Sequence, residues 1–312
     1  MKINPHTTAF VFPGQGSQTV GMGKDLAEQY PVAKQTFEEA DSILGFALST
    51  IMWDGPDTDV NDTVNTQPAL YVHSLAAFRT FSHLHPDFKP ALLAGHSLGE
   101  LSALAASGAI SFEDGLRLVR KRGELMKRAG QQSPGGMAAI LGLDIPTLDR
   151  VCAEASTPDE LVQVANDNCP GQVVISGAKP AVERAMAGAK NAGAKRALPL
   201  AVSIAAHSPL MNSMQEEWMD VVNSAIFFPL QIQVIGNVHA APLDEASARV
   251  DIIAQMQSRV RWTESVQFMV SNRINAFVEA GTGTVLGGLV KRITGEATVY
   301  PLGNPQDFAA LE

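Results

Sequence analysis

The stretch that decides the fold is Gly95-His96-Ser97-Leu98-Gly99, which follows the apolar residues 91–94 and precedes the helix-like run 100–106. This order predicts a strand, a tight turn and a helix, with Ser97 at the apex. Such a turn lifts a serine hydroxyl out of the sheet, and the flanking glycines let the backbone turn closely. The backbone N–H of Leu98 would then face a developing oxyanion. We predict that Ser97 is a nucleophile; the alternative is an ordinary strand–helix turn.

Composition narrows the class of protein. The 312 residues, 46% of them apolar, can bury a full core as one large domain or as a large domain with a smaller partner. The net charge of −9 argues against a nucleic-acid binder, which would show a basic face. No apolar run predicts a membrane span, and residues 1–6 lack the apolar core of a signal peptide. Two cysteines make neither a disulfide framework nor a zinc site, so we expect a cytoplasmic protein without a metal.

Strands and helices alternate at both ends of the chain. The predicted strands are 8–12, 91–94, 230–235 and 276–280, and the predicted helices lie near 23–29, 68–81 and 111–129. This alternation predicts a largely parallel sheet with helices on both faces.

The middle of the chain has a different order. Strands are predicted at 136–142, 161–165, 172–176 and 195–202, and helices at 146–155 and 180–192. The order β-α-β-β-α-β is the signature of a small ferredoxin-like domain. We therefore predict a large α/β domain over residues 1–132 and 203–312, interrupted by a ferredoxin-like domain over 133–202. A ligand is expected in the cleft between them.

A serine nucleophile needs a base, and His207 is the candidate among the seven histidines. It stands where the chain returns from the small domain to the large one. No Asp or Glu lies within the ten residues upstream, so another group, such as a backbone carbonyl, would have to orient the imidazole. A structural histidine at a domain junction is the alternative.

Arg122 is the one charged residue inside the apolar arc of the helix predicted over 111–129. A buried guanidinium must be paired. Its partner is either an internal carboxylate or a carboxylate on a substrate, held by the two-pronged arginine fork. The loop Gly14-Gln15-Gly16 after the first strand is not a P-loop, and it can place backbone donors or cradle an anion.

Several motifs, spread along nearly the whole chain, together indicate a known family. They are FVFPGQGSQ (10–18), TQPAL (66–70), GHSLGE (95–100), Arg122-Gly123, PGQVV (170–174), GAKR (193–196) and HSPLM (207–211). In these motifs the chain resembles the malonyl-CoA:acyl-carrier-protein transacylases of type II fatty-acid synthesis, with polyketide synthase acyltransferase domains as close relatives. The resemblance implies an α/β-hydrolase-like large domain and ping-pong transfer of a malonyl group. The implied partners are malonyl-CoA and acyl carrier protein, with no cofactor, nucleic acid or membrane.

The resemblance also implies a role for individual residues. Ser97 would be the acylated nucleophile and His207 its base. Arg122 would grip the free carboxylate of the malonyl group. The backbone amides of Gln15 and Leu98 would form the oxyanion hole, and the carbonyl of Gln255, located by counting back from Trp262, would orient the histidine.

The chain departs from the family pattern at two positions. Ala206 stands where family members usually carry serine or phenylalanine before the histidine, which leaves selectivity toward α-substituted malonyl groups open. Thr282 stands where proline is usual. Two other functions stay open: an acyltransferase serving a polyketide or malonate decarboxylase system, and a plain serine hydrolase. A hydrolase of simple esters has no need of a buried Arg122.

Docking of an acidic carrier protein onto an acidic enzyme would require a local basic patch. The candidates are Lys190, Lys195 and Arg196 on the small domain and Lys291 and Arg292 on a late helix. The alternative is that these are ordinary solvated charges.

Overall fold

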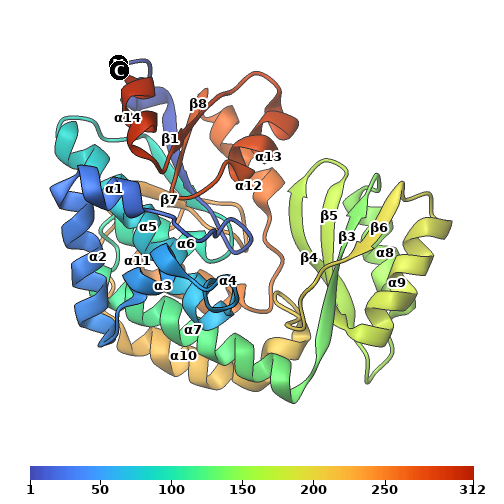
Figure 1. The fold of residues 1–312 in the computed structure, drawn as a ribbon. Helices are drawn as coiled ribbons and strands as arrows, with labels where there is room; N and C mark the ends of the chain where they lie inside the picture. Colours follow the sequence, from blue (N-terminus) through green and yellow to red (C-terminus); the bar gives the residue numbers. More distant parts are fainter.

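The structure is a computed structural model that describes residues 1–312, and its strands form two separate sheets (Figure 1). The larger sheet is parallel throughout, with the strand order β7-β2-β1-β8-β9. Its strands are β1 (Thr8–Phe12), β2 (Leu92–Gly95), β7 (Gln233–Ile235), β8 (Ala276–Ala280) and β9 (Thr298–Leu302). Four of these were predicted from the sequence, and the edge strand β9 was not.

Helices cover both faces of this sheet. Successive side chains of the central strand β1 point to opposite sides, and both sides of the strand are apolar and buried. Phe10 packs with Phe78 and Phe81 of α5 on one face. Val11 belongs to the core that α12 and α13 close on the other face. The helices of this domain are α1 (Lys24–Gln29), α2 (Pro31–Leu44), α3 (Leu48–Asp54), α4 (Asp57–Val60), α5 (Thr63–Leu84), α6 (Gly99–Ala106), α7 (Phe112–Gln132), α10 (Gln215–Ser224), α11 (Glu245–Gln255), α12 (Trp262–Ser271), α13 (Val285–Thr294) and α14 (Pro305–Leu311), with 3₁₀ turns η1 (Pro5–Thr7) and η2 (Pro209–Met214).

Helix α5 begins at Thr63, whereas the sequence predicted a start five residues later, at Pro68. Asp62 caps it by accepting the backbone N–H of Val64 at 3.3 Å. Pro68 has no N–H for the carbonyl of Val64 four residues earlier. Arg120 of α7 donates to that carbonyl at 2.9 Å instead, so the helix continues through the proline. No helix of the protein combines the length and the hydropathy that a bilayer crossing demands.

The second sheet has four antiparallel strands in the order β4-β5-β3-β6. Its elements are β3 (Gly135–Leu141), α8 (Ile145–Ala155), β4 (Val162–Cys169), β5 (Gln172–Ala178), α9 (Lys179–Asn191) and β6 (Arg196–Pro199). This is the β-α-β-β-α-β order expected from the sequence, although β6 ends three residues earlier than predicted. After Pro199 the chain bends toward the large sheet, and Val202 N–H donates to the carbonyl of Leu200 at 2.8 Å.

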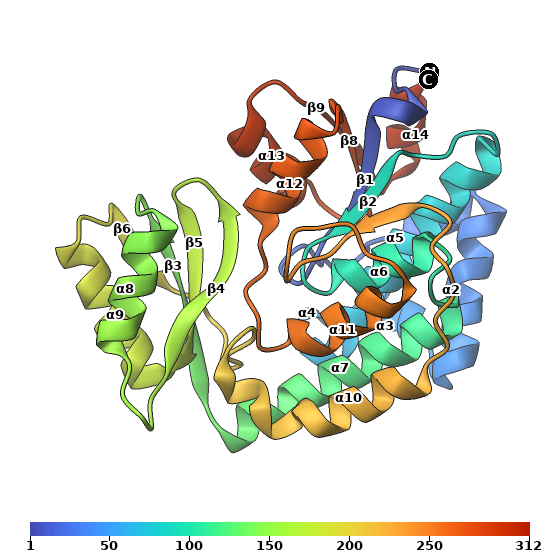
Figure 2. The same ribbon diagram turned by 180° about the vertical axis from the view of Figure 1, so that it is seen from behind.

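The two sheets lie side by side, joined by the chain after α7 and after β6 (Figures 1 and 2). Helices α8 and α9 cover one face of the antiparallel sheet, where Ile140 and Ile175 form its core. The other face carries Met137, Ala139 and Val174 and looks toward the large domain across a cavity. Strand β4 is tied to the large domain through a bridge between Asn166 and Val260.

Candidate functional site

Ser97 sits on a strained turn between β2 and α6, with a backbone φ of 54°. Positive φ is costly for a residue with a side chain, and it marks a serine raised above its sheet. The two flanking glycines are required by close contact. A Cβ on Gly95 would lie 1.9 Å from the carbonyl of Gly99, and one on Gly99 would lie 2.0 Å from the carbonyl of Phe12. The turn is therefore packed directly against the end of β1.

Asn237, which sequence reasoning missed, clamps this turn. Its side-chain oxygen accepts the backbone N–H of Ser97 at 2.7 Å, and its side-chain nitrogen donates to the carbonyl of Gly95 at 2.7 Å. Asn237 is buried and follows β7, the strand next to β2. Its position at the carboxyl edge of a parallel sheet was the available signal, because functional side chains gather at that edge.

His207 faces Ser97. Its Nε2 lies 2.7 Å from Ser97 Oγ, and its Nδ1 lies 2.8 Å from the backbone oxygen of Gln255. A carbonyl can only accept, so Nδ1 carries the proton and Nε2 is free to accept the serine O–H. The contact with Gln255 supplies the orientation that an acid gives elsewhere. Burial and the nearby charge of Arg122 lower the pKa of His207 to about 3, so the imidazole is neutral at physiological pH.

A side chain of the small domain holds the backbone of His207 from across the cleft. Gln163 on β4 donates through Nε2 to the carbonyl of His207 at 2.8 Å and to the carbonyl of Gln257 at 2.7 Å. Nothing in the local sequence around Gln163 indicates this role, since its partners lie 44 and 94 residues away.

Arg122 is buried beside the nucleophile. Its Nη1 donates to Gln67 Oε1 at 3.0 Å, and its Nη2 donates to Gln255 Oε1 at 2.9 Å and to Ser97 Oγ at 3.1 Å. These partners are all neutral, and no Asp or Glu forms an ion pair with the guanidinium. Burial lowers the pKa of Arg122 to about 10, which leaves it charged at neutral pH. Of the two partners left open by the sequence, the internal carboxylate is not in contact.

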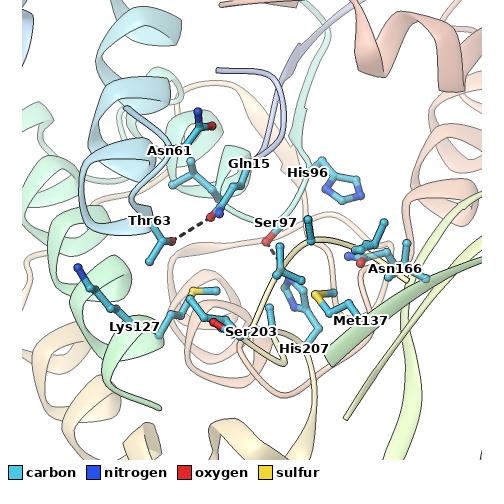
Figure 3. A pocket seen from close by; sticks show the side chains of 18 of the residues that line it. Gln15, Asn61, Thr63, His96, Ser97, Lys127, Met137, Asn166, Ser203 and His207 are labelled. Atoms are coloured by element: carbon cyan, nitrogen blue, oxygen red, sulfur yellow. Dashed lines mark hydrogen bonds between the residues drawn. The ribbon is translucent and has the colours of Figure 1, made fainter. Parts of the chain in front are cut away.

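Gln15 and Leu98, whose backbone amides the resemblance assigns to the oxyanion hole, line the same cavity as Ser97 and His207. Neither amide N–H donates a hydrogen bond within the chain. The loop that carries Gln15 is held against α5, because Thr63 Oγ1 donates to Gln15 Oε1 at 3.0 Å (Figure 3). Two free donors next to a nucleophile are the arrangement that stabilises an oxyanion.

The cavity between the two sheets has a volume of about 760 Å³. Figure 3 shows Gln15 and Thr63 on one side, Met137 and Asn166 on the other, and Ser97 between them. His96 turns away from the serine and its Nε2 bonds Asn168 Oδ1 at 2.8 Å. The chain brings together no cluster of histidine, cysteine and carboxylate side chains able to hold a metal ion.

Comparison with known proteins agrees with this geometry. Residues 9–298 match the model of the acyl transferase domain family. A malonyl CoA-acyl carrier protein transacylase of Haemophilus influenzae is 44% identical over 305 residues, which cover 97% of each chain. The crystal structure of an acyl carrier protein S-malonyltransferase from Vibrio cholerae is 45% identical, with a TM-score of 0.95 over 98% of this chain and 100% of that one. A malonyl-transacylase solved in complex with its type II polyketide acyl-carrier protein is 41% identical, with a TM-score of 0.94 over 97% and 98% of the two chains.

Proposed function

We infer the function of this chain from its site and from the acyl transferase family to which it belongs: it transfers the malonyl group of malonyl-CoA to the pantetheine thiol of acyl carrier protein. One observation carries the proposal. Ser97 Oγ lies 2.7 Å from a neutral base and 3.1 Å from a buried cation that has no carboxylate partner. The base suits an acyl-accepting serine, and the cation suits an acyl group that ends in a carboxylate.

In the first half-reaction Ser97 gives its proton to His207 Nε2 while Oγ attacks the thioester carbonyl carbon. The backbone amides of Gln15 and Leu98 hold the negative charge that forms on the carbonyl oxygen. The carbon–sulfur bond then breaks, His207 returns the proton to the sulfur, and coenzyme A leaves. The product is a malonyl ester on Ser97.

In the second half-reaction the pantetheine thiol of the carrier protein gives its proton to His207. The sulfur attacks the ester carbonyl through the same oxyanion, the ester bond breaks, and Ser97 Oγ takes the proton back. Both steps use the same base in the same tautomer, so the contact between His207 Nδ1 and the carbonyl of Gln255 serves each of them.

Arg122 selects the acyl group. In the structure its Nη2 donates to Ser97 Oγ, and a malonyl carboxylate would receive a charge-assisted, two-pronged contact from the same guanidinium. The reaction needs no cofactor, because the coenzyme A thioester is itself the substrate. The free, buried thiols of Cys152 and Cys169 fit the cytoplasm as the place where the protein works.

A carrier of a type II polyketide system is the second candidate acceptor, favoured by the 41% identical transacylase solved with such a carrier. Both acceptors present the same pantetheine thiol, so the choice depends on the protein surface around it.

Intact-mass measurement tests the proposal. The wild-type protein mixed with malonyl-CoA should gain one malonyl unit, and the gain should disappear when holo acyl carrier protein is added. The Ser97→Ala variant should gain nothing. Comparison of a fatty-acid carrier with a type II polyketide carrier identifies the acceptor. A malonyl gain that persists in Ser97→Ala, or a malonyl group that never reaches either carrier, contradicts the proposed function.

A further inference from the structure

Two buried carboxyl groups lie behind the nucleophile, and the reaction described above uses neither. Glu100 on α6 is 0% exposed and Asp251 on α11 is 3% exposed. Their side chains are within hydrogen-bonding reach of each other. Glu100 Oε1 and Asp251 Oδ1 have no other partner. Ionised carboxylates only accept hydrogen bonds, so the two groups can bond to each other only where one of them carries a proton.

Glu100 is the group that holds this proton. Complete burial and the neighbouring Asp251 carboxylate raise the pKa of Glu100 well above its ordinary value. Burial raises the pKa of Asp251 as well, but Asp251 accepts the backbone N–H of Val238 at 3.3 Å and lies near His239, and these two contacts act in the opposite direction. The carboxyl of Glu100 therefore donates to Asp251 and keeps its second oxygen, Oε2, as an acceptor.

Glu100 Oε2 accepts the side-chain amide of Gln255 at 2.5 Å. The same Gln255 nitrogen also donates to the carbonyl of Ser97 at 3.0 Å. Both N–H bonds of the Gln255 amide are thereby donated to Glu100 and to Ser97. The amide oxygen is left to accept from Arg122 Nη2, at 2.9 Å. A rotated amide would present N–H to a guanidinium that can only donate.

We propose that Glu100 acts as a neutral carboxylic acid that positions the Gln255 amide, and through it the Arg122 guanidinium, for the carboxylate of the substrate. A neutral acid supplies the acceptor that Gln255 needs without placing a negative charge behind Arg122, so the cation keeps its charge for the substrate. The inference deepens the proposed function and rests on it. Glu100 touches neither the substrate nor Ser97 Oγ, and it is a positioning residue.

The Glu100→Gln and Glu100→Met variants test this assignment. Glutamine reproduces the protonated acid, since its oxygen accepts from Gln255 and its N–H donates to Asp251. Malonyl loading by Glu100→Gln should therefore stay within about threefold of the wild-type kcat/KM. Methionine fills a similar volume without an acceptor. In Glu100→Met, kcat/KM with malonyl-CoA should fall roughly 10- to 100-fold, mainly through a higher KM, while slow loading from acetyl-CoA should change much less.

An infrared spectrum supplies a readout independent of activity. The wild-type protein at neutral pH should show the carbonyl band of a protonated carboxylic acid, and Glu100→Gln should lack it. If Glu100→Met does not fold, the glutamine variant and this band still decide the matter.

The inference is overturned if the wild type lacks the band, if Glu100→Gln loads malonyl as poorly as Glu100→Met, or if Glu100→Met loses both acyl donors equally. Malonyl loading of the wild type is measured first. Its failure would refute the proposed function itself, and it is thus distinguishable from a failure confined to the Glu100 variants.

Discussion

Asn237 and Ser97, 140 residues apart, are joined at the backbone of the nucleophile: the amide oxygen of Asn237 accepts the Ser97 N–H at 2.7 Å. The other half of the same side chain donates to Gly95, so a single residue spans both sides of the strained turn. The clamp holds a φ of 54° that the serine would not adopt unaided.

Removal of this clamp should cost stability. Asn237→Ala leaves a buried N–H and a buried carbonyl without partners, which should lower the free energy of unfolding by about 2–4 kcal/mol in urea titrations. Ser97 acylation should slow as well, because the turn relaxes. Asn191→Ala, an exposed asparagine at the end of α9, is the matched control and should change stability by about 0.5 kcal/mol or less. Equal effects at both positions would contradict the clamp.

Arg122→Ala should lower activity with malonyl-CoA much more than activity with acetyl-CoA. Loss of a charge-assisted, two-pronged contact should cost about 2–4 kcal/mol in kcat/KM with malonyl-CoA, whereas acetyl-CoA, which lacks the carboxylate, should lose far less. Arg117→Ala, in an exposed ion pair with Glu113 on the same helix, is the control and should leave both donors unaffected. Equal losses for both donors would make Arg122 a structural residue only.

The base should work at unusually low pH. Because burial and Arg122 lower the pKa of His207 to about 3, the free enzyme keeps its base neutral far below the ordinary histidine value of 6.5. The kcat/KM for Ser97 acylation, followed by rapid-quench mass spectrometry, should therefore stay flat from pH 7.5 to about pH 5. A fall of activity centred near pH 6.5 would show that the histidine titrates normally.

Stability should depend on pH through Glu100. Its pKa is raised in the folded protein, so the carboxyl stays protonated there after it has ionised in the unfolded chain. The stabilisation it contributes is complete below the unfolded value of 4.5 and declines as pH rises. Relative to Glu100→Gln, which cannot ionise, the wild type should thus lose stability between pH 4.5 and pH 7.5. Urea titrations of both proteins measure the difference, and a constant difference across this range would contradict the raised pKa.

Carrier docking should depend on the exposed basic residues of the small domain and of α13, none of which lines the cavity itself. Lys190, Lys195, Arg196 and Lys291 form no ion pair, and Arg292 contacts the side chain of Gln172, which borders the cavity. Charge reversal of Lys195 with Arg196, or of Lys291 with Arg292, should raise the KM for acyl carrier protein and leave loading of Ser97 from malonyl-CoA unchanged. Transfer to carrier that is unaffected by both reversals would exclude this surface.

Local patterns in the sequence singled out Ser97, His207 and Arg122, which the structure brings together. The glycines around Ser97 predicted the turn, and Arg122 stood out because it breaks the apolar arc of its own helix. The parallel sheet and the ferredoxin-like order were also readable from alternation. These features are visible because each depends on residues within a few turns of one another.

Long-range partners were not readable in the same way. Asn237, Gln163 and the Glu100–Gln255 pair act through contacts between segments 44 to 155 residues apart, and no local pattern encodes them. Strand β9 was missed because it is a half-exposed edge strand that contains Pro301. The start of helix α5 was predicted too late, because the helix continues through Pro68 with the help of a tertiary contact. That contact is the hydrogen bond from Arg120 to the carbonyl of Val64.

The contact between Gln163 and the carbonyl of His207 makes the smaller domain a support for a residue of the larger one. The imidazole of His207 is oriented by the large domain, through the carbonyl of Gln255, whereas the backbone of the same residue is held by a strand of the small domain. Separation of the two domains would leave the ring contact with Gln255 in place but free the backbone that carries the ring. A chain with residues 133–202 replaced by a short loop would therefore lose one of the two supports of His207.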